Sequence, residues 1–279
     1  MKAKFAEYLF GDQAIIPVGV TRIDDEAFDG CENLFDIELP NTITSIGDFA
    51  FRGCSNLLDI KIPGGVTRIG KGSFYNCDSL SAIDLPNSLE IIEDCAFEDC
   101  SSLEKVFIPK GVSKIGSRAF SGCWRLKEII LPDGIDRLEE YVFEGCHGLV
   151  DIRIPGNVTD IRFGAFRDCK GLKSVEIASG VQAIRDSAFC RCKGLGRMEI
   201  PTSVTMIEDY AFEDCVWLTE IIIPEGDISI GECAFSGCVR LTGIKQPAFS
   251  HDRRKIVKYL DDAVRNLYKK EEKAPWQKN

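Results

Sequence analysis

The sequence predicts an elongated solenoid of about ten 23-residue coils, with a parallel sheet on its concave face and short helical turns opposite. Three regularities support this. Phenylalanine recurs every 23 residues without a slip, at Phe28, Phe51, Phe74, Phe97, Phe120, Phe143, Phe166, Phe189, Phe212 and Phe235. A cysteine follows each of these by three residues, and a leucine follows each cysteine by three more. A repeat of this period is typical of solenoids, because one coil cannot bury its apolar face alone.

Each coil is predicted to contain a short strand that a proline ends. Residues 59–62 alternate polar and apolar side chains, which is the period of a half-buried strand. Pro63 follows, and proline ends a strand because it has no N–H to donate to the sheet. Proline holds this position along the chain, with Ala178 as the one substitute. The sequence therefore places a corner after every strand.

A second extended segment and a turn are predicted to complete the coil. Residues 66–69 alternate again, which favours a short extended run. Residues 71–76 suit one turn of helix, with Phe74 and Cys77 three apart on its inner side. Stacked coils would then bury continuous ladders of phenylalanine, cysteine and leucine.

The repeat resembles the BspA-type class of leucine-rich repeat, whose pattern reads L-x-x-I-x-I-P-x-x-V-T-x-I-G-x-x-A-F-x-x-C. In one coil it is carried by Leu57, Ile60, Ile62, Pro63, Val66, Thr67, Ile69, Gly70, Phe74 and Cys77. The resemblance covers roughly residues 11–247. It implies a leucine-rich-repeat solenoid that binds other macromolecules, often as a surface protein of bacteria or protozoa. We therefore expect a non-enzymatic scaffold for another protein, an extracellular-matrix component or a glycan, including a cell-surface adhesin.

Three regions are expected along the chain. Residues 1–23 are interpreted as an N-terminal cap and a partial repeat, and residues 24–247 as the regular solenoid without insertions. Residues 248–279 are interpreted as a helical cap and tail, because apolar residues between 256 and 268 follow a helical stripe. The alternative for this last region is a helix for partner binding or dimerisation.

The sequence gives two indications of location. Residues 1–10 do not form a secretory signal as they stand, because Glu7 and Asp12 interrupt any apolar run. That indicates the cytoplasm, whereas the family resemblance indicates the cell surface or secretion if a signal has been removed. No run approaches the roughly 18 apolar residues of a membrane span, so membrane insertion is not expected.

Charge argues against a nucleic-acid partner. The chain carries 34 basic and 44 acidic residues, hence a net charge of −10. Residues 247–279 hold nine Lys or Arg and five Asp or Glu, hence +4, which leaves −14 for the remainder. Nucleic-acid binding favours a basic face, so an acidic body is not expected to bind it.

Catalytic motifs are not found in the sequence. Its two histidines, His147 and His251, lie in different regions, and the first is interpreted as an exposed loop residue. A nucleophile and its base must converge in space, and neither a phosphate loop nor a Cys-x-x-Cys metal motif is present. We expect no enzymatic activity, no cofactor and no metal.

The cysteines are expected to be free thiols. Ten of the thirteen lie on the 23-residue phase and should be buried as small apolar side chains. Equivalent Cβ atoms in stacked coils would lie about 4.8 Å apart, beyond the usual ~3.5–4.5 Å of a disulfide. Cys95, Cys190 and Cys233 lie off this phase and are expected to be more accessible.

The candidate partner-binding residues are apolar or aromatic side chains at outward positions. Phe107 and Ile130 occupy the same outward strand position in adjacent coils, Arg153 follows them, and Ile222 lies further along the same row. Trp124 and Trp217 lie on loops next to the ladder cysteines, and aromatic residues are enriched in binding hot spots. Single exposed apolar residues are also normal, and the tryptophans have the alternative of folding over the coil edge. The alternative function is a structural or self-associating intracellular repeat protein, either monomeric or a weak homodimer.

Overall fold

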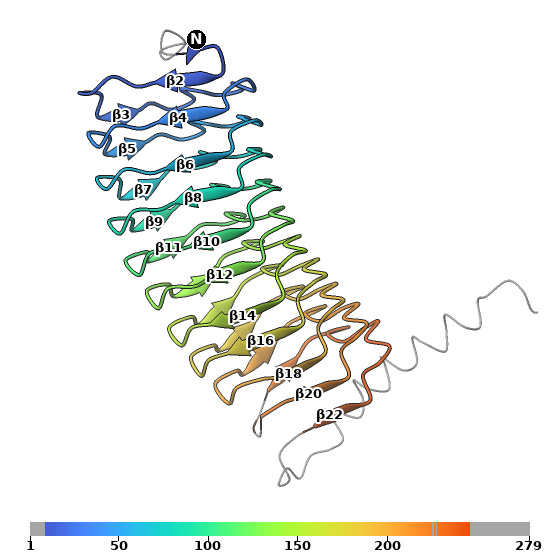
Figure 1. Cartoon of the computed structure of the whole chain (residues 1–279). Helices are drawn as coiled ribbons and strands as arrows, with labels where there is room; N and C mark the ends of the chain where they lie inside the picture. Colours follow the sequence, from blue (N-terminus) through green and yellow to red (C-terminus); the bar gives the residue numbers. More distant parts are fainter. Residues whose placement is uncertain (1–8, 225, 227, 246–279) are drawn as a thin grey trace, which may run out of the picture.

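The protein folds as a parallel β-solenoid. The computed structural model describes residues 9–224, 226 and 228–245, which form about nine turns of about 23 residues each (Figure 1). Each coil contributes a long strand and a short strand, and equivalent strands stack along the solenoid axis. The predicted solenoid and its repeat length are confirmed, with about nine turns where ten were expected.

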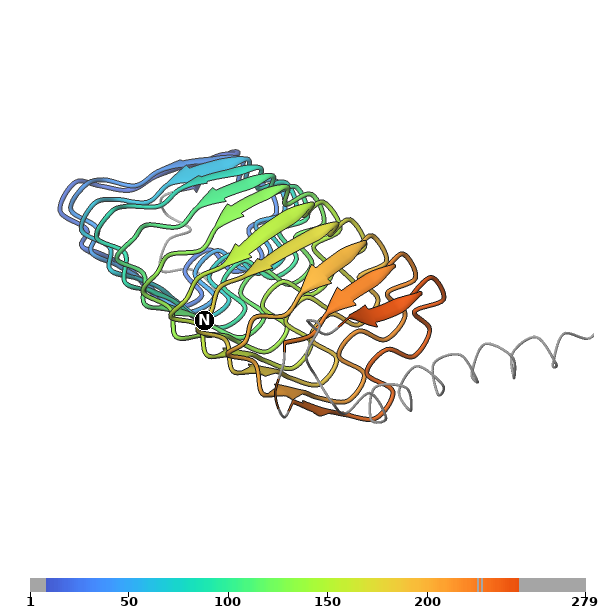
Figure 2. The same ribbon diagram turned by 90° about the horizontal axis from the view of Figure 1, so that it is seen from below.

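The long strands form one column along the molecule, on a surface that we call the strand face (Figure 2). They are β2 (Gln13–Ile15), β4 (Asp36–Glu38), β6 (Asp59–Lys61), β8 (Ala82–Asp84), β10 (Lys105–Phe107), β12 (Glu128–Ile130), β14 (Asp151–Ile154), β16 (Ser174–Ile177), β18 (Arg197–Glu199), β20 (Glu220–Ile222) and β22 (Gly243–Lys245).

The short strands form a second column (Figure 1). They are β3 (Arg22–Ile23), β5 (Ser45–Ile46), β7 (Arg68–Ile69), β9 (Ile91–Ile92), β11 (Lys114–Ile115), β13 (Arg137–Leu138), β15 (Asp160–Ile161), β17 (Ala183–Ile184), β19 (Met206–Ile207) and β21 (Ser229–Ile230). They correspond to the second extended run that the sequence predicts.

The strands pair in parallel with a register of one repeat. In β6 and β8, for example, Ile60 lies opposite Ile83. The middle residue of a long strand generally points inward and its two neighbours point outward, as the alternation of the sequence predicts. One pair differs, because β1 (Leu9–Phe10) lies antiparallel to β2 at the N-terminal end of the described chain. That the strand face is the concave one stays a prediction.

Proline forms the corner between the two strands of a coil. The Pro63 carbonyl oxygen accepts a hydrogen bond from the Val66 N–H at 3.0 Å, which closes a turn of four residues. The same bond recurs after Pro40, Pro86 and Pro109, and it also forms in the coil where Ala178 replaces proline. Proline therefore favours this corner without being essential to it.

The phenylalanines form one continuous stack through the core. Neighbouring rings in the ladder from Phe28 to Phe235 lie 5.1 to 5.8 Å apart between centroids, and their planes differ by 3° to 18°. All ten are buried, together with the leucine ladder from Leu34 to Leu218. Each coil thus buries its apolar face on its neighbours, as the repeat predicts.

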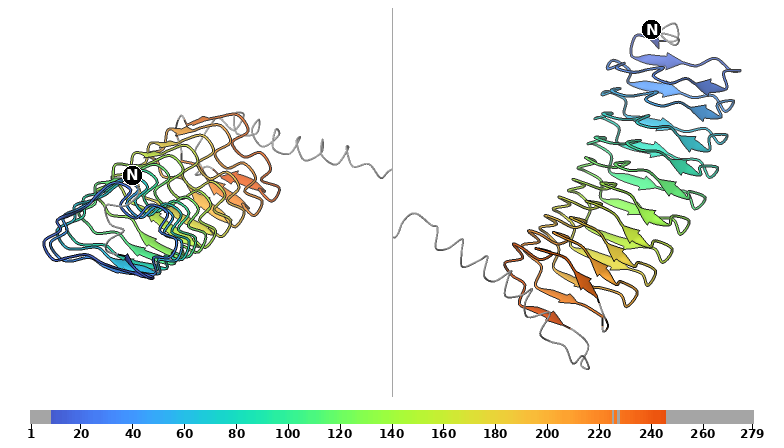
Figure 3. Two further views of the ribbon diagram at one scale, coloured as in Figure 1. Left: turned by 90° about the horizontal axis from the view of Figure 1, so that it is seen from above. Right: turned by 180° about the vertical axis from the view of Figure 1, so that it is seen from behind.

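The expected helical turns are wrong. In the part of the chain that the structure describes, the segment between short strand and cysteine is a series of backbone turns with no helix (Figure 3). Its residues Gly72 and Asn76 have φ angles of 54° and 58°, in the left-handed region. An α-helix needs consecutive right-handed residues, so two left-handed residues four apart stop it from forming.

Hydrogen bonds between coils explain these turns. The N–H groups of Gly72, Phe74 and Asn76 donate to carbonyl oxygens of the next coil, each at 2.9 Å. Left-handed residues recur at both positions in every coil from Glu26 and Gly30 onward. The turn is therefore bonded to its neighbours along the axis, as the strands are. The helix expected within residues 248–279 lies outside the described residues.

Candidate binding site on the strand face

An exposed apolar pair lies in the middle of the strand face. Phe107 ends β10 and Ile130 ends β12, and the two residues are direct partners in the parallel register. Their side chains are 63% and 60% exposed, because both occupy the outward position of the alternation. We call this pair the apolar patch. An exposed apolar pair within a charged surround is typical of an interaction site.

The charges on one side of the apolar patch neutralise one another. At the start of the same two strands, Lys105 forms an ion pair with Glu128 at 2.9 Å. One residue earlier, Lys127 donates to Glu104 at 2.9 Å, and this hydrogen bond lowers the pKa of the Glu104 carboxyl group. Both pairs join one coil to the next. A partner on the apolar patch would therefore meet paired charges at this border.

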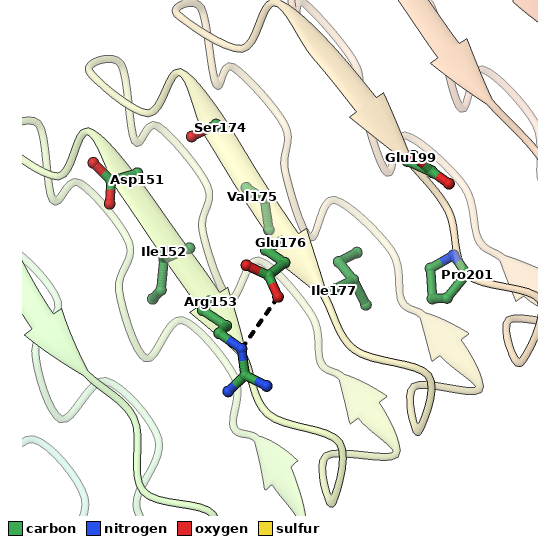
Figure 4. A pocket seen from close by; sticks show the side chains of 9 residues that line it. All are labelled: Asp151, Ile152, Arg153, Ser174, Val175, Glu176, Ile177, Glu199 and Pro201. Carbon is green, nitrogen blue, oxygen red and sulfur yellow. Dashed lines mark hydrogen bonds and ion pairs between the residues drawn. The ribbon is translucent and has the colours of Figure 1, made fainter.

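A polar groove continues the strand face beyond the apolar patch. It is formed over β14, β16 and the end of β18, and its volume is about 550 Å³ (Figure 4). Arg153 on β14 forms an ion pair at 3.2 Å with Glu176 on the adjacent strand β16, and Asp151, Ser174 and Glu199 also line the groove (Figure 4). The groove carries three carboxylates and one guanidinium, so it is acidic overall.

Three of the predicted residues come together. Phe107, Ile130 and Arg153 lie on successive strands at the outward position, so the apolar patch leads directly into the polar groove. Ile222 shares this row but lies four coils beyond Ile130, on β20, where its side chain is half-buried next to Glu199. Ile222 is therefore separate from the patch.

The two tryptophans lie away from the patch on corner segments that lead into the long strands. Trp124 is 57% exposed and stacks on His147, with ring centroids 6.3 Å apart. Trp217 is 52% exposed and lies under the Arg240 guanidinium, whose Cζ is 3.5 Å from the ring centroid. Neither folds inward over the coil edge. His147 is half-buried rather than exposed, because Trp124 covers one face of its ring.

The ladder cysteines from Cys54 to Cys238 are buried free thiols, as expected, and burial raises the pKa of those at Cys77, Cys100 and Cys123. The cysteines off the ladder differ from one another. Cys233 is exposed, Cys95 is half-buried, and Cys190 is buried. The expected accessibility of Cys190 is therefore wrong, because its thiol packs in the turn near Glu213, 3.6 Å from the carboxylate oxygen.

The acidic residues of the groove are not distinguished by the sequence alone. Asp151, Glu176 and Glu199 lie at outward positions, where acidic residues are common on any solvent-exposed surface. Their grouping becomes visible only when the rows of neighbouring coils are read together. Within the described residues, no three His, Cys, Asp or Glu side chains converge to hold a metal ion, and no helix there could span a bilayer.

Comparisons with known proteins agree with the solenoid fold. The BspA type leucine-rich repeat region matches residues 21–150 and 137–252, in six copies. The chain belongs to the BspA-type leucine-rich repeat family. No curated protein matches it.

Solved structures of bacterial leucine-rich repeat proteins are similar to this chain. A leucine-rich repeat protein from Bacteroides ovatus is 32% identical with a TM-score of 0.79, over 88% of this chain and 65% of that one. A leucine rich cell surface protein from Faecalibacterium prausnitzii is 30% identical with a TM-score of 0.55, over 86% of this chain and 72% of that one. The pneumococcal vaccine antigen PcpA shares the fold at 20% identity and a TM-score of 0.56, over 88% of this chain and 65% of that one.

This BspA-type protein is thus a repeat scaffold that is similar to a bacterial leucine rich cell surface protein. It spans about 65% of the length of the Bacteroides ovatus structure. The family typically provides binding scaffolds rather than enzymes.

Proposed function

We propose that this protein is a non-enzymatic binding scaffold that recognises another protein through its strand face. The observation that supports it best is the apolar patch, in which Phe107 and Ile130 are both about 60% exposed on adjacent strands. Leaving two large apolar side chains in water forgoes about 1.5–3 kcal/mol each relative to full burial. A partner that covers the patch would recover that free energy.

The neighbouring charges would orient the partner. The Arg153–Glu176 pair and the groove beside it offer polar contacts next to the apolar patch. Interfaces commonly combine a small apolar centre with a polar rim, and the centre supplies most of the binding free energy. We therefore assign Phe107 and Ile130 to the centre, Arg153 to the rim, and Ile222 to a separate contact along the same row.

The relatives, rather than the site, support a location for the protein. The similarity to a cell surface protein supports an extracellular partner, such as a host protein or an extracellular-matrix component. The second candidate function is self-association, in which the apolar patches of two copies cover each other.

The test is a pull-down with the intact protein and two double variants. The first is Phe107→Asp with Ile130→Asp. The second is Phe35→Asp with Leu58→Asp, a matched control, because Phe35 and Leu58 are also exposed apolar residues in adjacent coils, at 47% and 38%. Circular dichroism first confirms that all three proteins fold alike.

Extracellular-matrix extract and lysate of the source organism are the two pools of partners. We expect a partner to be captured by the wild type and by the control, and to be lost with the Phe107→Asp, Ile130→Asp variant. Equal capture by all three proteins would refute the strand-face site. Light scattering on the purified chain tests self-association. Self-association through the apolar patch predicts a dimer that is lost in the Phe107→Asp, Ile130→Asp variant.

A further inference from the structure

The corner segments that lead into the long strands change charge midway along the solenoid. Each is four residues long, with a ladder leucine in third place. The first four corners, at 32–35, 55–58, 78–81 and 101–104, contain three acidic residues and no Lys or Arg. The next six, at 124–127, 147–150, 170–173, 193–196, 216–219 and 239–242, contain no acidic residue. These six hold Arg125, Lys127, Lys170, Lys173, Lys193 and Arg240.

We call the six later corners the basic edge. Their backbones are bonded to one another along the axis, so they form a continuous surface. Lys173 N donates to the Val150 oxygen at 2.7 Å, and Gly196 N donates to the Lys173 oxygen at 3.3 Å. The same backbone hydrogen bonds continue from Gly196 to Thr219 and from Thr219 to Thr242. Five steps of about 4.8 Å make a track on the order of 24 Å long.

Lys127 of the basic edge is paired with Glu104, but other cations of this edge are available to a ligand. Arg125, Lys173 and Lys193 are exposed, and none has an ion-pair partner among the residues that the structure describes. Lys170 lies 3.9 Å from Asp168, but that carboxylate also takes Arg191 at 3.1 Å. In a protein with a net charge of −10, this edge is a local concentration of uncompensated positive charge.

A strip of bare backbone separates the cations. Gly148, Gly171 and Gly194 occupy the second corner position in three successive coils. A Cβ atom at Gly171 would lie 2.1 Å from the His147 oxygen, and one at Gly194 would lie 2.8 Å from the Lys170 oxygen. The backbone of the preceding coil therefore leaves no room for a Cβ atom at Gly171 or Gly194. The row of glycines leaves a strip without side chains, which has Lys170 and Lys193 on one side and Lys173 on the other.

One exposed tryptophan lies at each end of this strip. Trp124 and His147 form a stacked pair at one end, and Trp217 with Arg240 forms a cation–π pair at the other. Tryptophan presents an apolar face beside a polar N–H, so it contacts ligands that have both apolar and polar surfaces. The edge thus combines aromatic faces, a flat strip and cations in two rows.

We propose that the basic edge binds a linear acidic polysaccharide, a chain of sugar rings that carry carboxylate or sulfate groups. Charge complementarity with the lysines and arginines supports an anionic ligand. The flat strip accepts ring faces, and its glycines offer no side chains that would contact those of an acidic peptide. Single-stranded nucleic acid stacks successive bases on aromatic side chains, whereas Trp124 and Trp217 lie four coils apart. This site lies beyond the strand face and is independent of the protein partner proposed there.

The test measures the affinity of the intact protein for a fluorescent oligogalacturonate by anisotropy at low salt. Neutral dextran and an oligothymidylate serve as comparison probes. The edge variant is Lys170→Gln with Lys173→Gln and Lys193→Gln. Its matched control is Lys61→Gln with Lys71→Gln and Lys110→Gln, three exposed lysines away from the edge whose removal changes the net charge equally. Trp217→Ala tests the aromatic end.

We expect the edge variant to weaken oligogalacturonate binding by about tenfold or more, and to make the affinity less sensitive to salt, because fewer cations meet the polyanion. The control should stay within about twofold, since its lysines lie elsewhere. Trp217→Ala should weaken binding of the sugar more than that of the oligothymidylate. Phe107→Asp with Ile130→Asp should leave it unchanged.

Three results would overturn the proposal. They are equal weakening by the two triple lysine variants, tighter binding of the oligothymidylate than of the oligogalacturonate, and absence of oligogalacturonate binding by the wild type at low salt. Each is independent of the pull-down result, because that experiment reads a different face of the solenoid.

Discussion

The Cys77 thiol donates a hydrogen bond to the carbonyl oxygen of Phe51 in the preceding coil, with 3.1 Å between Sγ and O. The same oxygen also accepts the N–H of Cys54 at 3.1 Å. Equivalent hydrogen bonds of 3.0 to 3.2 Å join the thiol of every ladder cysteine from Cys54 to Cys238 to the carbonyl oxygen of the ladder phenylalanine in the preceding coil. The ladder cysteine is thus a small apolar side chain that also satisfies the second lone pair of a buried carbonyl.

This bond predicts that a ladder cysteine contributes to stability beyond its apolar volume. Cys123→Ala removes the thiol and leaves the Phe97 oxygen with one partner, so we expect unfolding free energy to fall by about 1–3 kcal/mol. Cys233→Ala is the control, because Cys233 is exposed and lies off the ladder; its effect should stay within about 0.5 kcal/mol. Urea denaturation measures both. Equal effects would refute the structural role of the ladder thiol.

The phenylalanine stack predicts a larger loss in the centre of the solenoid. Phe120 is fully buried between Phe97 and Phe143, with ring centroids 5.3 and 5.8 Å away. Phe120→Ala should lower the unfolding free energy by about 3–5 kcal/mol, because it leaves a cavity in a close-packed ladder. Phe107→Ala, which deletes the same side chain from an exposed site, should stay within about 0.5 kcal/mol. A similar cost at both positions would contradict the assignment of core and surface.

The left-handed residues of the turns predict a contrast between two glycines. Gly53 has a φ of 69°, and a Cβ atom there would come no closer than 3.6 Å to another atom, so the cost of Gly53→Ala is conformational. We expect a loss of about 1–2 kcal/mol. Gly64→Ala, at a glycine without a left-handed φ and with open space around its Cα, should be neutral or slightly stabilising. Equal unfolding midpoints for the two variants would show that the turn tolerates other geometries.

Thiol burial predicts selective alkylation. Burial is the main cause that raises the pKa of Cys95 and that of Cys190 to about 12, so at pH 8 almost none of either thiol is the reactive thiolate. Cys233 is exposed and should react with iodoacetamide first, while the buried ladder thiols react only after denaturation. Peptide mapping by mass spectrometry measures the order. Early modification of Cys100 or Cys123 in the folded protein would contradict the packing described above.

The 23-residue repeat predicts almost all of the fold, because every coil buries apolar side chains at the same positions. The alternation of residues 59–62 predicts β6, and Pro63 predicts the corner that follows it. The turn was predicted as helix because Phe74 and Cys77 are spaced as on a helix face. Nothing in that spacing reveals that Gly72 and Asn76 adopt left-handed angles and donate to the next coil. Bonding between coils 23 residues apart overrides the local preference.

The sequence predicts the candidate site only at those outward positions that hold an apolar residue, because most outward positions hold a charged one. Phe107 and Ile130 stand out in the sequence because their row is otherwise mostly charged. Glu176 and Asp151 do not, since each is a common surface residue whose role depends on the coils beside it. The basic edge likewise emerges when corner residues are compared between coils, because no single corner is strongly basic.

The most direct test of the strand-face account is the equilibrium affinity of the captured partner, measured by calorimetry for the wild type and three variants. With Phe107→Asp and Ile130→Asp, we expect affinity to fall about a hundredfold or more, as for a hot spot. The Phe35→Asp, Leu58→Asp variant and the Lys170→Gln, Lys173→Gln, Lys193→Gln variant should stay within about threefold, a change of under 1 kcal/mol. An unchanged affinity in the first variant, or an equal loss in all three, would contradict recognition through Phe107 and Ile130.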